Sequence, residues 1–145
     1  MRKSLYCSTC GARLTAPLTI LSGKDPKVAK PLIEDRKPIV PRGTGYKAWE
    51  ATPWLYRAPG ETLSFVPQYW LNPADLTDAV QFPKNGAGLD GCCGIIGLGG
   101  PNQLCRCKSA IGTLQDDCMT PKVFIPEPTA TVWAEGASDH LSPSP

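Results

Sequence analysis

Cysteines are the residues in this sequence whose type and spacing most clearly point to chemistry. The chain of 145 residues holds seven of them, and Cys7 and Cys10 are separated by two residues and followed by Gly11. Two cysteines at this spacing can bring both thiolates to one tetrahedral ion from a single tight turn, with each sulfur about 2.3 Å from a zinc. Gly11 lets the backbone bend past the second thiolate without a clash from a Cβ atom. The segment therefore predicts half of a metal site.

The segment from Cys7 to Leu14, with the sequence CSTCGARL, resembles one knuckle of a zinc ribbon. The ions of that family are structural, so the resemblance implies a structural Zn²⁺ and a second pair of ligands elsewhere in the chain. It covers this short segment only. The rest of the sequence departs from the family's pattern, because no second pair of cysteines is separated by two residues.

Cys105 and Cys107 are our first choice for the second pair. Residues 103–107 and 110–113 read as two strands of a hairpin that turns at Lys108 and Ser109, and side chains two apart on a strand point to one face. We therefore predict a zinc site that joins the N-terminal knuckle to the C-terminal hairpin, with the ligands Cys7, Cys10, Cys105 and Cys107. The runner-up ligands are Cys92, Cys93 and Cys118. The alternatives are buried thiols that pack as small apolar groups, or a redox centre.

The composition favours short elements and long loops. Fourteen glycines and sixteen prolines interrupt helices and strand ladders. We expect a small α+β domain, β-rich and loop-rich, over residues 1–136, with a Pro-rich arm at 16–45 and a tail at 137–145. Asn72 as N-cap and Pro73 at the first position predict a helix over residues 73–80. Short extended pieces are expected at residues 18–21, 39–40, 54–57, 62–67, 123–125 and 131–134.

Motifs that imitate enzyme sites lack the context that their chemistry requires. Gly86, Gly88 and Gly91 match a dinucleotide-binding fingerprint, but a turn precedes them and Cys92-Cys93-Gly94 is a poor start for a helix. The one histidine, His140, lies near the Pro-rich end, where nothing fixes the geometry of a general base. We therefore expect a protein that is not an enzyme.

Charge and aromatic residues indicate binding to a partner. Residues 1–58 carry eleven Lys and Arg against four Asp and Glu, whereas residues 59–145 carry four against nine. Trp49, Trp54 and Trp70 fall in an aromatic-rich segment and are candidate anchors for a partner. We expect a cytoplasmic interaction protein, either an adaptor or a subunit of a larger assembly, with no membrane span. The alternatives are a nucleic-acid-binding zinc protein that uses the basic half, or a cysteine-based redox protein.

Overall fold

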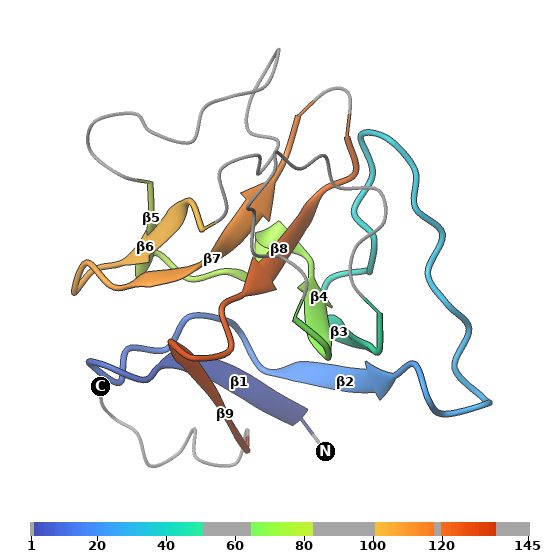
Figure 1. Cartoon of the computed structure of the whole chain (residues 1–145), viewed down its shortest axis with the longest axis horizontal. Helices are drawn as coiled ribbons and strands as arrows, with labels where there is room; N and C mark the ends of the chain where they lie inside the picture. The colour runs from blue at the N-terminus through green and yellow to red at the C-terminus, as the bar shows by residue number, and fades with distance from the viewer. Residues whose placement is uncertain (1, 51–64, 83–100, 118–119, 136–145) are drawn as a thin grey trace.

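A single curled sheet dominates the computed structural model, which describes residues 2–50, 65–82, 101–117 and 120–135 (Figure 1). The sheet has nine strands in the order β5-β6-β7-β8-β4-β3-β2-β1-β9. All paired neighbours are antiparallel except β2 and β3, which run parallel. The strands are β1 (Arg2–Cys7), β2 (Leu18–Ser22), β3 (Thr44–Ala48), β4 (Gln68–Leu71), β5 (Val80–Gln81), β6 (Gln103–Cys105), β7 (Ala110–Gln115), β8 (Val123–Pro126) and β9 (Thr131–Glu135).

The expected α+β class is wrong, because the regular secondary structure of the described residues is almost entirely β. The predicted helix over residues 73–80 is reduced to one 3-10 turn, η1 (Pro73–Asp75). Asn72 caps this turn as expected, since its side chain accepts a hydrogen bond from the Ala74 N–H at 2.8 Å. The turn then ends at Leu76, whose backbone is extended, and the Thr77 N–H donates to the carbonyl of Leu14. Bonding to a neighbouring segment thus replaces the next helical turn.

Two apolar cores occupy opposite faces of the sheet, because successive strand residues point to opposite sides. The first core consists of Leu5, Cys7, Leu14, Leu18, Leu71, Ala79, Cys105, Ile111, Leu114 and Phe124. The second core consists of Ile39, Val40, Tyr46, Ala48, Trp70, Val123 and Ile125. The neighbours Trp70 and Leu71 on β4 enter different cores, and both side chains are fully buried.

Several expected strands are present, with shifted ends. β2, β8 and β9 lie at the predicted positions, and β6 and β7 form the predicted hairpin. Residues 39–40 are buried in the second core, but they are not part of a strand. The predicted strand at 54–57 lies outside the described residues, as does most of the one at 62–67; its last residues precede β4 and are not extended into the sheet.

Curling of the sheet brings distant strands together. β6 is second in the strand order and β1 is eighth, so a flat sheet would hold them far apart. The right-handed twist between neighbouring strands accumulates over a sheet of this width. The ends of β1 and β6 consequently meet across the first core, and each of these ends carries a cysteine, Cys7 or Cys105. No helix in the described part of the chain has the length and apolar character needed to cross a membrane.

Candidate metal centre

The first knuckle (residues 7–12) begins at the last residue of β1. The Gly11 N–H donates to the carbonyl of Cys7 at 2.8 Å, and the Cys7 N–H donates to the carbonyl of Ala12 at 2.9 Å. Gly11 has a φ of 78°, in the left-handed region that favours glycine. This positive φ reverses the chain directly after Cys10, which turns both sulfurs toward the same side.

The second knuckle (residues 105–109) begins at the last residue of β6 and has a similar hydrogen-bond pattern. The Lys108 N–H donates to the carbonyl of Cys105 at 2.7 Å, and the Cys105 N–H donates to the carbonyl of Ser109 at 2.9 Å. Lys108 also has a φ of 78°. Cys107 therefore lies in the turn and not on the strand that the sequence predicts. The turn brings its sulfur to that of Cys105, so the alternation argument for this pair is wrong even though the pair forms.

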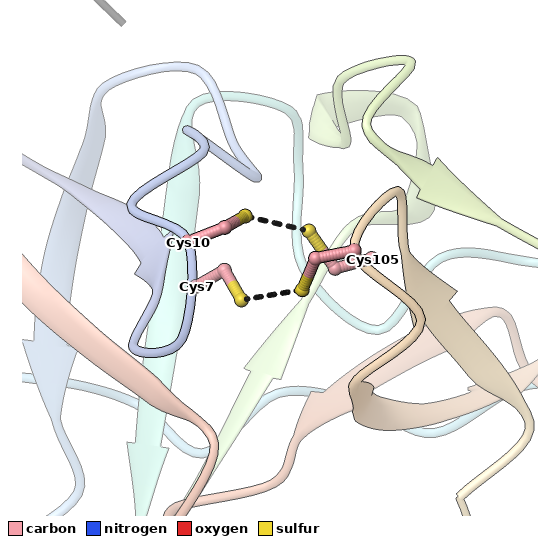
Figure 2. Close-up of side chains that lie close together, drawn as sticks. Cys7, Cys10 and Cys105 are labelled. Atoms are coloured by element: carbon pink, nitrogen blue, oxygen red, sulfur yellow. Dashed lines mark hydrogen bonds between the residues drawn. The ribbon is translucent and has the colours of Figure 1, made fainter.

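The four sulfurs of the two knuckles face one another (Figure 2). The Sγ atoms of Cys7 and Cys107 are 3.6 Å apart, and those of Cys10 and Cys105 are 3.5 Å apart. All four Sγ atoms lie within 4.8 Å of one another. Four thiolates around a tetrahedral zinc are separated by about 3.8 Å, given Zn–S bonds of about 2.3 Å. The cysteines are free thiols, and their positions suit a metal ion.

Each knuckle contributes one buried and one accessible sulfur. Cys7 and Cys105 are 1% and 0% exposed, whereas Cys10 is exposed and Cys107 is half-buried. Each of the two close contacts joins a buried cysteine of one knuckle to an accessible cysteine of the other. The site therefore sits at the edge of the first core, where an ion could enter from solvent.

The local environment shifts the pKa values of the two thiols of the second knuckle in opposite directions. Burial raises the pKa of Cys105 to about 12, because an apolar surrounding disfavours the thiolate. Contact with the Ser109 hydroxyl, 3.4 Å from the Cys107 sulfur, lowers the pKa of Cys107 to about 6. The Ser109 hydroxyl also donates to Thr9 Oγ1 at 3.0 Å, which links the two knuckles beside the sulfurs. Of the two thiols in the second knuckle, Cys107 is thus the better prepared to meet a cation as a thiolate.

The donor set is chemically suited to a soft metal ion. Four soft sulfur ligands select Zn²⁺, Cu⁺ or iron–sulfur clusters over hard ions such as Mg²⁺ and Ca²⁺. The buried cysteines lie at strand ends, where Cys7 is paired with Thr131 of β9 and Cys105 is paired with Val80 of β5. The structure therefore supports a four-cysteine site that could hold a metal ion, composed of the residues preferred from the sequence.

The other residues selected from the sequence either lie outside the described residues or differ in their exposure to solvent. The runner-up ligands Cys92, Cys93 and Cys118 lie outside the described residues, as do His140 and Trp54. Trp70 is fully buried in the second core, where its indole N–H donates to Gln68 Oε1 at 3.2 Å, so its side chain is not available at the surface. Trp49 is exposed.

Two features of the site were missed in the sequence. The first is the positive φ at position 108, where the residue is a lysine and not the glycine that usually indicates such a φ. The second is the hydrogen bond between Thr9 and Ser109, which are 100 positions apart. A signal for the first does exist, since Lys108 follows the second cysteine of its pair just as Gly11 follows Cys10.

Comparisons with protein-family models, with curated proteins and with solved structures give no match to this chain. The geometry of the four cysteines is therefore the basis on which a function can be assigned.

Proposed function

We propose that this chain is a non-enzymatic, zinc-stabilised interaction protein that serves as an adaptor or as a subunit of a larger assembly. The observation that carries the proposal is the meeting of four cysteine sulfurs from two knuckles about one hundred positions apart, within 4.8 Å of one another. Four protein thiolates fill the coordination sphere of zinc, and closed sites of this kind are structural, whereas catalytic sites keep one position open.

A structural ion at this place would hold the curled sheet together. Metal ligation would tie the end of β1 to the end of β6, which are not adjacent in the sheet. By the chain-entropy argument used for disulfides, closing a loop of about 100 residues restricts the unfolded state by about 4.7 kcal/mol. Binding energy at a site absent from the unfolded chain is also folding energy. Zinc would therefore contribute to stability directly.

Metal analysis of the purified protein tests the proposal. We expect one zinc per chain and a thermal transition that falls in the presence of a strong chelator. The matched control is a chain in which Cys10 and Cys107, the two accessible cysteines, are both replaced by serine; its transition should be low and unaffected by chelator. A metal-free wild-type protein whose transition the chelator leaves unchanged would contradict the proposal.

A cysteine-based redox protein is a second candidate, and the two cross-knuckle sulfur contacts of 3.6 and 3.5 Å favour it. Two thiols that form a disulfide release two protons and two electrons, which reduce one molecule of hydrogen peroxide to two waters. Treatment with peroxide followed by mass spectrometry separates the candidates. Rapid formation of Cys7–Cys107 and Cys10–Cys105 disulfides in protein as isolated would favour redox chemistry, and slow oxidation with retained zinc would favour the structural role.

A further inference from the structure

An exposed tryptophan and two lysines form a small surface on the face of the sheet that carries the first core. Lys47 lies on β3, beside Ser22 of β2 and Tyr69 of β4 in the register of the sheet. Trp49 follows β3 and Lys24 follows β2. We call Lys24, Lys47, Trp49 and Tyr69 the Trp49 surface.

Both lysines lie against the Trp49 ring. The Lys24 Nζ is 3.8 Å from the ring centroid and the Lys47 Nζ is 4.7 Å from it. Lys47 is also 5.8 Å from the centroid of Tyr69, whose ring packs against Trp133 at 5.1 Å. An ammonium group at these distances is attracted to the negative face of an aromatic ring. The rings therefore hold two positive charges at a fixed place on the sheet.

Hydrogen bonds fix the orientation of the indole. The Trp49 Nε1–H donates to Ser22 Oγ at 3.2 Å, and the same oxygen accepts from the Lys24 N–H at 3.1 Å. The Trp49 side chain is nevertheless 36% exposed. A rigid, half-covered aromatic side chain loses little conformational entropy on binding, which is a property of energetically dominant interface residues.

Neither lysine of the Trp49 surface has a carboxylate partner in the part of the chain that the structure describes. Within the described residues, the ion pairs of this region join Lys30 to Glu50 and Lys37 to Glu34, and neither Lys24 nor Lys47 has a carboxylate partner. Among residues 2–50, 65–82, 101–117 and 120–135, the surface thus offers two ammonium groups without a carboxylate partner around one exposed indole. This arrangement is complementary to carboxylates next to an apolar side chain.

We propose that the Trp49 surface binds a short acidic segment of a partner protein, with carboxylates on Lys24 and Lys47 and an apolar side chain on Trp49. The inference rests on the proposed function as an interaction protein and assigns a surface and a partner class to it.

The charges around the surface favour a peptide over a nucleic acid. The exposed Asp25 directly follows Lys24, and Glu50, which pairs with Lys30, directly follows Trp49 in the chain. A phosphodiester backbone carries one negative charge per nucleotide and binds through many contacts along its length, so interleaved carboxylates repel it. A short segment with two or three carboxylates can contact both lysines and avoid these groups.

Binding is tested on the full-length, metal-loaded protein with a synthetic peptide that is rich in glutamate and contains leucines. The control peptide has glutamine in place of glutamate, and a single-stranded oligonucleotide is the third probe. We expect the acidic peptide to shift the NMR signal of the Trp49 indole N–H and to bind less tightly as salt increases. We also expect the variant with both Lys24→Gln and Lys47→Gln to bind about tenfold or more weakly.

A matched control variant combines Lys37→Gln and Lys122→Gln, which removes the same net charge from exposed lysines that already have carboxylate partners. It should bind the acidic peptide like the unaltered protein. The proposal is overturned by an unshifted Trp49 signal, by equal weakening in the two double variants, or by tighter binding of the oligonucleotide at the same lysines. Zinc content and the thermal transition are measured on the same samples, so absence of peptide binding to the unaltered protein with zinc retained counts against this surface alone.

Discussion

The two knuckles hold their cysteines in turns of different length. The first knuckle closes its outer hydrogen bond from residue 7 to residue 12, and the second closes it from residue 105 to residue 109, which is one residue shorter. In both, the residue after the second cysteine has a φ of 78°, but this residue is Gly11 in one and Lys108 in the other. A knuckle is therefore defined by a chain reversal after its second sulfur, and the number of residues between the sulfurs can vary.

The two knuckles also place their sulfurs in the same way. The first cysteine of each knuckle ends a strand and is buried, and the second lies in the turn and is accessible. The shared pattern arises because a strand end is fixed by its ladder, whereas the turn projects beyond the sheet. The two knuckles share the positive φ after the second cysteine, but the glycine at position 11 suits that φ better than the lysine at position 108.

The largest expected effect comes from removing a buried ligand. Cys105→Ser should abolish tight zinc binding and lower the thermal transition by on the order of 10 °C, because the loop closure worth about 4.7 kcal/mol is lost. Cys7→Ser should behave alike, since both cysteines are buried at the ends of strands. Calorimetry with metal analysis measures both variants, and a retained zinc in either one would break the equivalence.

The next largest effect concerns the pKa of the Cys107 thiol in the second knuckle. Ser109→Ala should raise the pKa of this thiol from about 6 toward its ordinary value of 9.0, because the thiolate loses a hydroxyl that can turn from Thr9 Oγ1 and donate to its sulfur. Protons then compete with zinc below the restored pKa, so affinity should fall about tenfold near pH 7 and much less near pH 9. Competition with a chromogenic chelator at the two pH values measures this.

Thr9→Val is the matched control for this experiment. It removes the hydroxyl that accepts from Ser109 but leaves the contact between Ser109 and Cys107 intact. Equal losses at both pH values in Ser109→Ala would show that the serine acts by positioning the turn and not through the pKa of the thiol.

Gly11 tests the backbone requirement of the first knuckle. A Cβ at this position would meet no atom within 4 Å, so Gly11→Ala adds no steric contact. The cost should come from the positive φ alone and amount to about 1 kcal/mol of unfolding free energy. Urea unfolding of the zinc-loaded protein measures it, and a neutral result would mean that the turn tolerates an alternative backbone.

Replacing Lys108 should give the smallest change in the free energy of unfolding, and this change should be a gain in stability. Lys108→Gly removes a side chain from a residue with a φ of 78° and should stabilise the folded protein by a few tenths of a kcal/mol up to about 1 kcal/mol. The gain is limited because glycine also increases the entropy of the unfolded chain. Urea unfolding of Lys108→Gly and of Gly11→Ala, measured under the same conditions, compares the two variants. If the two turns share their geometry, the first variant should be more stable than the unaltered protein and the second less stable.

The sequence by itself determined the features that depend on neighbouring residues. The spacing of Cys7, Cys10 and Gly11 specifies a turn, Asn72 followed by Pro73 specifies a capped turn, and residues 103–113 specify a hairpin. The four cysteines that the structure brings together could be chosen in advance, because each pair is local and two pairs complete a tetrahedral site.

Tertiary structure decided everything that depends on distant partners. The helix does not continue after η1 because Thr77 donates hydrogen bonds to the backbone carbonyls of Leu14 and Arg13. These carbonyls are distant in the sequence, so the residues around Pro73 do not predict the bonds. Trp70 resembled Trp49 in sequence, yet alternation on β4 placed it in the second core. The curl that unites β1 with β6 arises from twist accumulated over the strands between them, so the four-cysteine cluster exists only once the sheet has formed.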